Sequence, residues 1–400
     1  MKVLSLFSGI GAFEKALVNL GIPYELVGYC EIDKYASRSY SAIHGVPESL
    51  NLGDITKVDA ETLPKDIGLL TYGFPCQDIS NAGKMKGLFN ADGTKTRSGL
   101  FFEALRIIEA TKPKVAIAEN VKMLTSRKFA AEFKIVLDSL EQAGYNNYFK
   151  VLNAKDQGIP QNRERVFIVS IRKDIDTGSF TFPESIPLNI RLKDVLESEV
   201  DEKYFVKAEL TRKLVIDREP VEPQVLRLVR NEHGKQIRKR YESGEIVEPW
   251  GSMKQYEPRT DGVSNTVSTV LKDNILLIRE ATKTGYAEAT VGDSINFEYP
   301  NSKTRRGRVG KQVSQTLVTS PQQGVVMDDL RIRYYTPREC FRLMGFDDVD
   351  FDNAARVNAH RQLYKQAGNS IVVPVVQRII SNLVESGVLL NVNIYTREVC

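Results

Sequence analysis

The run VLSLFSGIG, residues 3–11, is a short apolar segment followed at once by a turn with two glycines. The apolar part is typical of a buried strand, and the amphipathic residues 12–20, which stop at Gly21, are typical of a helix. Glycines at a strand-to-helix turn let a ligand approach the backbone; a turn that only packs the helix on its strand is the alternative. The segment predicts the first strand and helix of an α/β domain.

The same alternation continues to about residue 174. Further strands are expected at residues 26–30, 67–72, 115–118 and 165–171, and helices at residues 100–110 and 129–140. Alternating strands and helices with short connections produce a sheet with helices on both faces. We predict an α/β fold with a doubly wound, mostly parallel sheet.

The alternation stops between residues 174 and 329, where Pro, Arg and Thr are frequent and strand-like runs are short. It resumes at Thr336-Pro-Arg-Glu339, where threonine is an N-cap, proline suits the first helical turn and glutamate completes a capping box. We therefore predict a discontinuous large domain made of residues 1–185 and 331–400. Residues 186–330 are predicted to form a smaller, irregular, strand-rich domain.

Positive charge is concentrated in the middle of the chain. The net charge is +4 over 400 residues, yet residues 203–240 carry +6 and residues 303–311 carry +5. Such clusters indicate a polyanion-binding surface, with a solvated charged face as the alternative. The N-terminal run is a poor signal peptide, and no apolar run approaches the roughly 20 residues that cross a bilayer. We expect a cytosolic protein without membrane contact.

Four cysteines occur in the chain, and one stands in YGFPCQDIS, residues 72–80, directly after an apolar run. None belongs to a C-x-x-C pair or has a histidine nearby in sequence, which argues against zinc and thioredoxin-like motifs. We predict no metal site. So few cysteines also argue against a disulfide framework. Cys76 is then a buried structural thiol or a lone nucleophile.

A cofactor pocket is expected where the first three strands end. Glu31 closes the second strand about 20 residues after the glycine turn, where an acid can accept hydrogen bonds from ribose hydroxyls. Glu14 takes the place of a third glycine, which disfavours a pyrophosphate cradle and favours a nucleoside without phosphates, such as S-adenosylmethionine. In Gly53-Asp54-Ile55 the acid can bind an adenine amino group, and the isoleucine can cover the adenine ring.

Cys76 and Glu119 both follow predicted strands. We expect them at the carboxyl edge of the sheet, where ligands bind in open parallel sheets. No histidine stands nearby in sequence to deprotonate the thiol, whose ordinary pKa is about 8.5. A thiol and a carboxyl group without a histidine favour a substrate activated by protonation over protease-type acyl chemistry.

The order of these motifs resembles that of the bacterial cytosine-5 DNA methyltransferases. The resemblance covers residues 1–185 and 330–385. Its motifs are residues 7–11, Glu31, 53–55, 73–77, Arg97 with 99–100, 119–121, 161–165, 338–345 and 366–370. The P-C-Q, E-N-V and Q-x-R-x-R elements are specific in combination. Ser8 stands where the family often has alanine, and Ala12-Phe13 where a further glycine is common.

The resemblance implies a covalent mechanism. Cys76 would attack carbon 6 of cytosine, so that carbon 5 can accept the methyl group of S-adenosylmethionine. Glu119 would protonate or hydrogen-bond ring nitrogen 3, while Arg163 and Arg165 would orient and activate the base. The base that removes the carbon-5 proton is not identified; water is a candidate. Cofactor binding is expected of Phe7, Gly9, Ile10, Gly11, Glu31, Ile32, Asp54, Ile55, Pro75, Leu100, Asn369 and Ser370.

The resemblance also implies a substrate of double-stranded DNA, from which the target cytosine must be extruded at a cost of a few kcal/mol. Residues 81–99, rich in glycine and lysine, would close over the flipped base; an ordinary disordered loop is the alternative. Residues 186–330 would be the target-recognition domain, and the large domain the catalytic one. DNA contacts are expected of Ser80, Lys84, Lys86, Arg97, Arg238, Lys239, Arg240, Arg305, Arg306 and Arg308.

Two other functions stay open. One is a tRNA cytosine-5 methyltransferase, and the other is a non-catalytic DNA-binding regulator with a residual cofactor pocket. The long basic middle region favours duplex DNA, and the presence of Cys76 and Glu119 favours an enzyme. We expect a monomer on DNA within a restriction–modification system, with a cognate restriction endonuclease acting on the same site. An orphan or phage-borne enzyme is the alternative.

Overall fold

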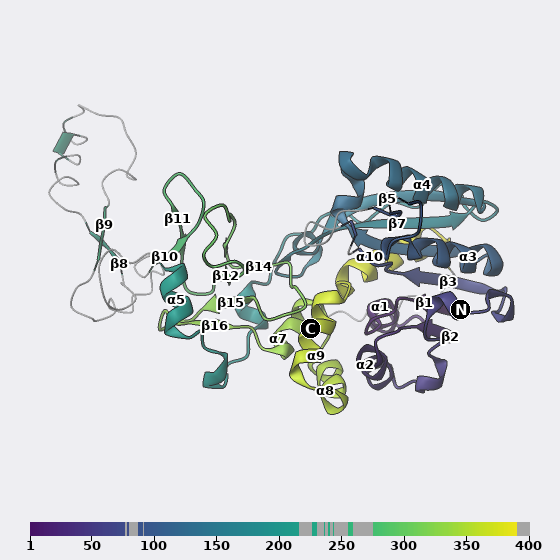
Figure 1. Cartoon of the computed structure of the whole chain (residues 1–400), viewed down its shortest axis with the longest axis horizontal. Helices are drawn as coiled ribbons and strands as arrows, with labels where there is room; N and C mark the ends of the chain where they lie inside the picture. The colour runs from purple at the N-terminus through teal and green to yellow at the C-terminus, as the bar shows by residue number, and fades with distance from the viewer. Residues whose placement is uncertain are drawn as a thin grey trace. The chain divides into compact units, whose positions relative to one another are not determined.

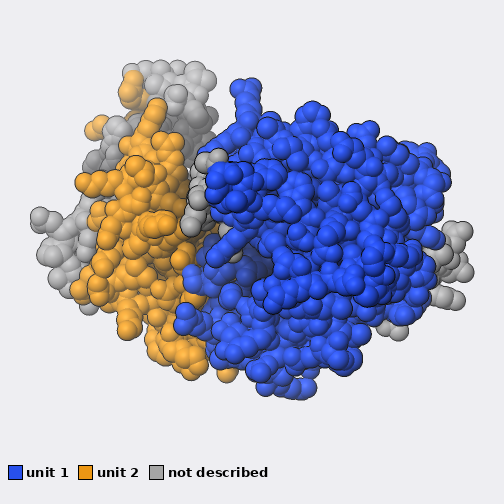
Figure 2. Space-filling view, turned by 45° about the vertical axis from the view of Figure 1, so that its right-hand side comes forward, with its two compact units in different colours: residues 1–190, 316–320, 337–400 blue, residues 191–315, 321–336 orange. Residues whose placement is uncertain are grey.

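The chain divides into two compact units, shown in separate colours in Figure 2. The computed structural model describes residues 1–76, 78–79, 87–90, 92–215, 226–229, 236, 239–240, 243, 255–258 and 275–389. Unit 1 comprises residues 1–190, 316–320 and 337–400, and unit 2 comprises residues 191–315 and 321–336. The roles expected of the two domains stay predictions.

Unit 1 is built on a six-stranded sheet (Figure 1). Its strands are β1 (Lys2–Leu6), β2 (Glu25–Cys30), β3 (Ile67–Tyr72), β4 (Val115–Val121), β5 (Tyr145–Asn153) and β7 (Glu164–Arg172). The order across the sheet is β2-β1-β3-β4-β7-β5. Neighbours among β1 to β4 are parallel, whereas β7 runs antiparallel to both β4 and β5. The predicted α/β fold with a mostly parallel sheet is confirmed.

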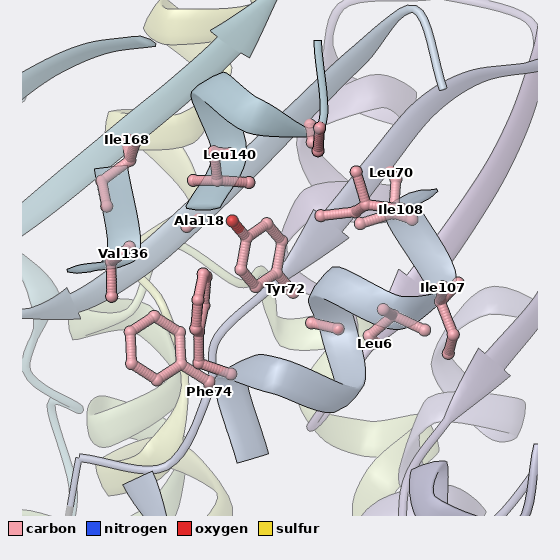
Figure 3. Packing of buried hydrophobic residues seen from close by; sticks show 14 of the residues in the cluster. Leu6, Leu70, Tyr72, Phe74, Ile107, Ile108, Ala118, Val136, Leu140 and Ile168 are labelled. Carbon is pink, nitrogen blue, oxygen red and sulfur yellow. The ribbon is translucent and has the colours of Figure 1, made fainter. Parts of the chain in front are cut away.

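Helices cover both faces of this sheet. The helices of unit 1 are α1 (Ala12–Asn19), α2 (Lys34–His44), α3 (Phe101–Thr111), α4 (Ala130–Gln142), α7 (Pro337–Leu343), α8 (Asp348–Val357), α9 (His360–Asn369) and α10 (Val373–Glu385). On one face, α3 and α4 pack on alternate residues of the central strands, and Figure 3 shows Tyr72 amid this packing, near Ala118 and Phe74. Strand β3 is buried along its whole length, so the other face is covered too; there α1 and α10 pack together (Figure 1). Unit 1 therefore contains helices from both ends of the chain.

Local sequence explains where several helices begin and end. Asp33 caps α2 by accepting a hydrogen bond from the Tyr35 amide, and Gly45 ends that helix with a φ of +64°. Helix α7 begins at Pro337, where the Thr-Pro-Arg-Glu pattern predicts it. Each of these residues supplies a group or a backbone conformation that a helix end requires.

Unit 2 consists of short strands around a small core. Its elements are α5 (Ala208–Leu214), β8 (Leu226–Val229), β9 (Gln255–Pro258), β10 (Leu276–Arg279), β11 (Tyr286–Ala289), β12 (Ser294–Asn296), β13 (Val309–Gly310), β14 (Ser314–Gln315), β15 (Gln323–Val326) and β16 (Ile332–Tyr334). Four of them form the antiparallel sheet β13-β12-β15-β16. The buried side chains around this sheet include Ile295, Val326 and Ile332. Across the described ranges, no helix combines the length and the apolar composition that a bilayer crossing requires.

Candidate active site

Five strand ends meet at one edge of the unit 1 sheet. Because β1 to β4 are parallel, the loops that carry Phe7, Glu31 and Cys76 leave the sheet on the same side as the end of β4. Strand β7 is antiparallel to β4, and it pairs Arg165 with Val121. The amino end of β7 therefore lies at the same edge as the carboxyl ends of β1 to β4.

Glu119 and Arg165 form an ion pair at this edge. In the register of β4 and β7, Phe167 lies opposite Glu119, so Arg165 is its diagonal neighbour on the same face. Arg165 Nε lies 3.0 Å from Glu119 Oε1, and both side chains are less than one-fifth exposed. Because the site is largely buried, this charge-assisted hydrogen bond holds the Glu119 carboxyl group in one orientation.

Burial and charge act in opposite directions on the reactive groups. Burial raises the pKa of the Cys76 thiol, the Glu119 carboxylate raises it further, and the guanidinium groups of Arg165 and Arg163 lower it. Burial likewise raises the pKa of Glu119, against the influence of the same two arginines. Proximity to one buried acid and two cations distinguishes Cys76 from an ordinary structural thiol. Across the described residues, no group of three or more His, Cys, Asp or Glu side chains could hold a metal ion.

The loop that carries Cys76 is fixed on both sides. Asn120 Nδ2 donates a hydrogen bond to the Phe74 carbonyl at 3.0 Å, which ties the loop to β4. The Ile79 amide donates to the Cys76 carbonyl at 3.0 Å and closes a turn after the thiol. A side chain at Gly73 would place its Cβ 3.8 Å from Glu119 Oε2, so glycine leaves the space beside the carboxylate free.

The glycine turn after β1 has a conformation that other residues rarely adopt. Phe7, Gly9 and Gly11 all have positive φ angles, of +52°, +57° and +81°. A Cβ at Gly9 would meet no atom within 4 Å, so open space lies beside this backbone. A Cβ at Gly11 would instead lie 2.0 Å from Nε2 of the His44 ring. Gly11 is therefore required by packing, whereas Gly9 borders room for a ligand.

Glu31 joins the first two loops of the pocket. Its Oε2 accepts a hydrogen bond from the Gly9 amide at 2.9 Å, and its Oε1 accepts one from the Asp33 amide at 2.7 Å. Burial raises the pKa of Glu31, and these two N–H donors lower it. Both oxygens retain lone pairs for further donors such as ribose hydroxyls.

Asn51 is a site residue that the sequence reasoning missed. Its Oδ1 accepts hydrogen bonds from the Glu31 and Gly53 amides, and its Nδ2 donates to the Glu31 carbonyl. It thereby fixes the spacing between the loop after β2 and the segment around Gly53, which lies between α2 and β3. The only signal for it was an asparagine two residues before a glycine, which is common in turns without a functional role.

The other predicted cofactor residues differ in accessibility. Ile32 is 78% exposed, whereas Ile55 is 4% exposed and belongs to the core, so Ile32 offers the larger apolar surface to a ring. Asp54 Oδ1 accepts hydrogen bonds from the amide and hydroxyl of Thr56, which leaves Oδ2 for a ligand. The remaining predicted residues are Ile10 and Ser370, both buried, Pro75 and Leu100, both half-buried, and Asn369, which is exposed.

Arg163, which the sequence predicts to orient the base, binds backbone carbonyls in the structure. It is 4% exposed, and its guanidinium donates to the carbonyls of Leu317, Gly368 and Ser370 at 3.1, 3.1 and 2.8 Å. Burial and Arg165 lower its pKa to about 9, so it remains charged at neutral pH. Its bonds connect backbone segments within unit 1.

The residues predicted to contact DNA differ in accessibility. Ser80, Lys84, Lys86 and Arg238 lie outside the described residues. Arg97, Lys239, Arg240 and Arg306 are exposed. Arg305 is half-buried and pairs with Glu298 at 2.8 Å.

Arg308 requires a correction. It is 1% exposed, and its guanidinium donates to the carbonyls of Asn296, Glu298 and Tyr299. A buried guanidinium that is bound to loop carbonyls cannot also reach a phosphate. The sequence-based expectation of a DNA contact at Arg308 was therefore wrong, because a run of basic residues does not reveal which of them folds inward.

The electrostatics of Cys76 predict how its alkylation by iodoacetamide depends on pH. Glu119→Gln removes a negative charge that disfavours the thiolate, so the midpoint of the rate–pH profile is expected to move to lower pH. Arg165→Gln removes a positive charge, so the midpoint should move to higher pH. Mass spectrometry of the Cys76 peptide measures the rates, and the buried Cys30 and Cys340 should react slowly in every variant. Unchanged midpoints in both variants would contradict the proximity of these charges to the sulfur.

Comparison with known proteins identifies the family of the chain. The family described as C-5 cytosine-specific DNA methylase matches residues 1–385. The chain is 33% identical to the orphan methyltransferase M.SPRI of Bacillus phage SPR, over 96% of this chain and 98% of that protein. It is 32% identical to the type II methyltransferase M.HhaI of Haemophilus parahaemolyticus, over 96% of this chain and 94% of that protein.

Solved structures share the fold. The S. pombe Dnmt2 methyltransferase matches with a TM-score of 0.51 at 20% identity, over 96% of this chain and 98% of that one. The Entamoeba histolytica methyltransferase EhMeth matches with a TM-score of 0.55 at 16% identity, over the same shares. The family match across residues 1–385 and the two relatives at more than 30% identity show that the chain belongs to the C-5 cytosine-specific DNA methylases and is a DNA cytosine-5 methyltransferase.

Proposed function

We propose that the chain methylates carbon 5 of an extruded cytosine through a covalent bond between Cys76 and carbon 6. The observation that carries this proposal is the position of the Cys76 thiol within the electrostatic influence of Glu119 and Arg165, which are themselves 3.0 Å apart. Carbon 5 of cytosine is a poor nucleophile, so a catalyst must first supply electrons to the ring.

Each side chain has a defined task in this reaction. The Cys76 thiolate forms a bond to carbon 6, and Glu119 donates a proton or hydrogen bond to ring nitrogen 3, where the displaced electrons collect. Carbon 5 then behaves as an enamine carbon and takes up the methyl group. Loss of the carbon-5 proton to a base, with water as a candidate, allows elimination of the thiolate. A proton donated to nitrogen 3 returns to Glu119 as the ring is restored. Burial raises the pKa of Glu119, which favours the protonated form that this donation requires.

The residues of the glycine turn fit S-adenosylmethionine, which supplies the sulfonium methyl group when it is bound. Open space borders Gly9, Glu31 presents lone pairs beside that space, and Ile32 offers an exposed apolar side chain. Asp54 has a free oxygen for an amino group. We assign the nucleoside to these residues, and the methionine end to Asn369 and Ser370.

A substitution at Glu31 tests this cofactor pocket. Glu31→Gln is expected to weaken S-adenosylmethionine binding by roughly 10- to 100-fold, the scale of losing hydrogen bonds to a charged group. Isothermal titration calorimetry of the whole chain measures the affinity. Glu25→Gln, at the exposed opposite end of the same strand, serves as control and should bind normally. Equal affinities of the two variants would remove Glu31 from the pocket.

Two arginines of unit 2, the exposed Arg306 and the half-buried Arg305, are proposed to bind DNA phosphates. Replacing Arg305 and Arg306 together by glutamine should weaken DNA binding and reduce the slope of log K against log salt by about 2, one for each lost contact. Arg172→Gln is the matched control, since Arg172 pairs with Asp174 at the opposite end of β7 from Arg165. A salt slope that is unchanged in the double variant would show that these two arginines face away from the duplex.

The two other functions are separated by one assay. Purified protein is incubated with labelled S-adenosylmethionine and either duplex DNA or tRNA, and the label on each nucleic acid is counted. Label on DNA alone supports the proposal, label on tRNA alone supports a tRNA methyltransferase, and none supports a non-catalytic regulator. Bisulfite sequencing of DNA from cells that express the chain then identifies the methylated site.

A restriction–modification role is proposed with a monomer acting on DNA and a cognate endonuclease that cuts the same site. The relatives include both orphan and type II methyltransferases, so their names leave the orphan role as the alternative. Cleavage of unmodified DNA at the mapped site by a lysate of the source cells would support the first role.

A further inference from the structure

Gln161 and Arg163 bind three stretches of chain that are far apart in sequence. Gln161 Oε1 accepts from the Leu317 amide at 3.2 Å, and its Nε2 donates to the Leu343 carbonyl at 2.8 Å. Arg163 donates to the Leu317 carbonyl and to the carbonyls of Gly368 and Ser370. Both side chains are at least 95% buried, so their bonds form in a dry environment where each is worth more than at the surface.

Residues 316–320 are held as an insertion in unit 1. They belong to unit 1, although the residues on both sides of them belong to unit 2. The Thr316 hydroxyl adds a third bond, to the Asn162 carbonyl at 2.9 Å. Gly368 packs directly on their backbone, since a Cβ there would lie 2.4 Å from the carbonyl carbon and oxygen of Val318. Leu317 is buried, whereas residues 318–320 are exposed.

The second stretch, residues 368–370, leads to the reactive groups. It contains Asn369 and Ser370, which we assign to the methionine end of the cofactor. The next residue, Ile371, places its Cδ1 3.6 Å from the position of a Cβ on Gly73, and Glu119 Oε2 lies 3.8 Å from that same position. Arg163 is thereby connected, through the backbone of residues 368–371, to the side chain of Ile371 near Glu119.

We propose that Gln161 and Arg163 form a clasp that positions two different parts of the enzyme. Both fix residues 316–320. At these residues the chain of unit 2, for which we propose DNA recognition, passes through unit 1, for which we propose catalysis. Arg163 alone also fixes residues 368–370 on the cofactor side. Arg163 is then a positioning residue for DNA and cofactor together, rather than a group that touches the base. This inference rests on the proposed DNA and S-adenosylmethionine binding.

The clasp predicts that the two substitutions have different effects on binding. Gln161→Ala should weaken binding of duplex DNA by roughly tenfold, because one bonded partner of Leu317 is lost, and should leave S-adenosylmethionine affinity unchanged. Arg163→Ala should weaken both affinities by at least that factor. Gly368→Ala should reproduce the Arg163→Ala pattern without removing a charge, because its Cβ would push residues 316–320 and 368–370 apart. Affinities are measured by fluorescence anisotropy for DNA and by calorimetry for the cofactor.

Methylguanidinium added to Arg163→Ala provides a second readout. If the variant keeps its fold by circular dichroism, added methylguanidinium should restore both affinities in part, and it should have no effect on Gln161→Ala. If Arg163→Ala does not fold, Gln161→Ala and Gly368→Ala still test the clasp. Of these two variants, only Gly368→Ala is expected to lower the affinity for the cofactor. Arg172→Gln is the arginine control.

The Nε of Arg163 is buried and has no hydrogen-bond partner among the described residues, so a direct contact with the base is the competing account. That account predicts normal affinities for DNA and cofactor in Arg163→Ala, with only kcat lowered, and this result would overturn the clasp. Failure of the wild-type chain to bind S-adenosylmethionine or DNA would instead overturn the proposed function.

Discussion

Cys76→Ser is expected to abolish methyl transfer. The hydroxyl of serine has a far higher pKa than a thiol and is a weak nucleophile toward carbon 6. We expect kcat to fall by at least roughly 10⁴-fold, the scale on which removal of a covalent nucleophile acts. The exchange of sulfur for oxygen changes little in size, so the affinities for DNA and S-adenosylmethionine should stay within a factor of about three. Transfer of labelled methyl groups to duplex DNA measures the rate.

Cys340→Ala is the control for this experiment. Cys340 is 5% exposed in α7, where burial and the Glu339 carboxylate raise the pKa of its thiol. Its loss should lower stability and leave kcat near the wild-type value. A Cys76→Ser variant that transfers methyl groups at the wild-type rate would show that no bond to sulfur is needed.

Glu119→Gln is expected to have the second largest effect. Glutamine retains the size of the side chain and can donate a hydrogen bond to ring nitrogen 3, but it cannot transfer a proton. We expect kcat to fall by about 10²- to 10³-fold, within the range for a positioned acid. The loss of the ion pair with Arg165 adds to this effect, because the guanidinium is then left without its partner.

The control is a glutamate that pairs with an arginine elsewhere in unit 1. The side chain of Glu103 is 18% exposed, close to the 13% of Glu119, and it pairs with Arg106 in α3 at 3.0 Å. Glu103→Gln should keep kcat within a factor of about two, since a paired surface charge contributes at most about 1 kcal/mol to stability. Equal kcat values for the two glutamine variants would show that Glu119 is a structural residue.

The fold could be predicted where local pattern determines it. The strands that end before Phe7, Glu31 and Cys76 are short apolar runs that stop at turn-forming residues, and they form the parallel part of the sheet. The strand β5 could not be predicted, because YNNYFKVLN, residues 145–153, has no clear alternation of polar and apolar residues. The antiparallel direction of β7 also depends on which strands pair, and pairing is not encoded within any one strand.

Part of the site could be predicted from sequence patterns in the same way. Motif order indicated Cys76 and Glu119 as partners, because residues after parallel strands lie at one edge of a sheet. It could not indicate whether an arginine faces a substrate or the backbone. Arg163 and Arg308 both bind carbonyls inside the protein, and Arg165 alone of these three pairs with Glu119. Whether an arginine faces a substrate or the backbone depends on how distant segments of the chain pack, and this packing cannot be read from a single sequence.

The most direct test of the account is covalent capture on a duplex that carries 5-fluorocytosine at the mapped target site. Fluorine cannot leave carbon 5 as a cation in the way a proton does, so the complex between Cys76 and the base should persist after methyl transfer. We predict a band that resists denaturing electrophoresis, depends on added S-adenosylmethionine and is absent for Cys76→Ser. A wild-type enzyme that methylates ordinary cytosine yet forms no such band on the fluorinated duplex would contradict the covalent mechanism.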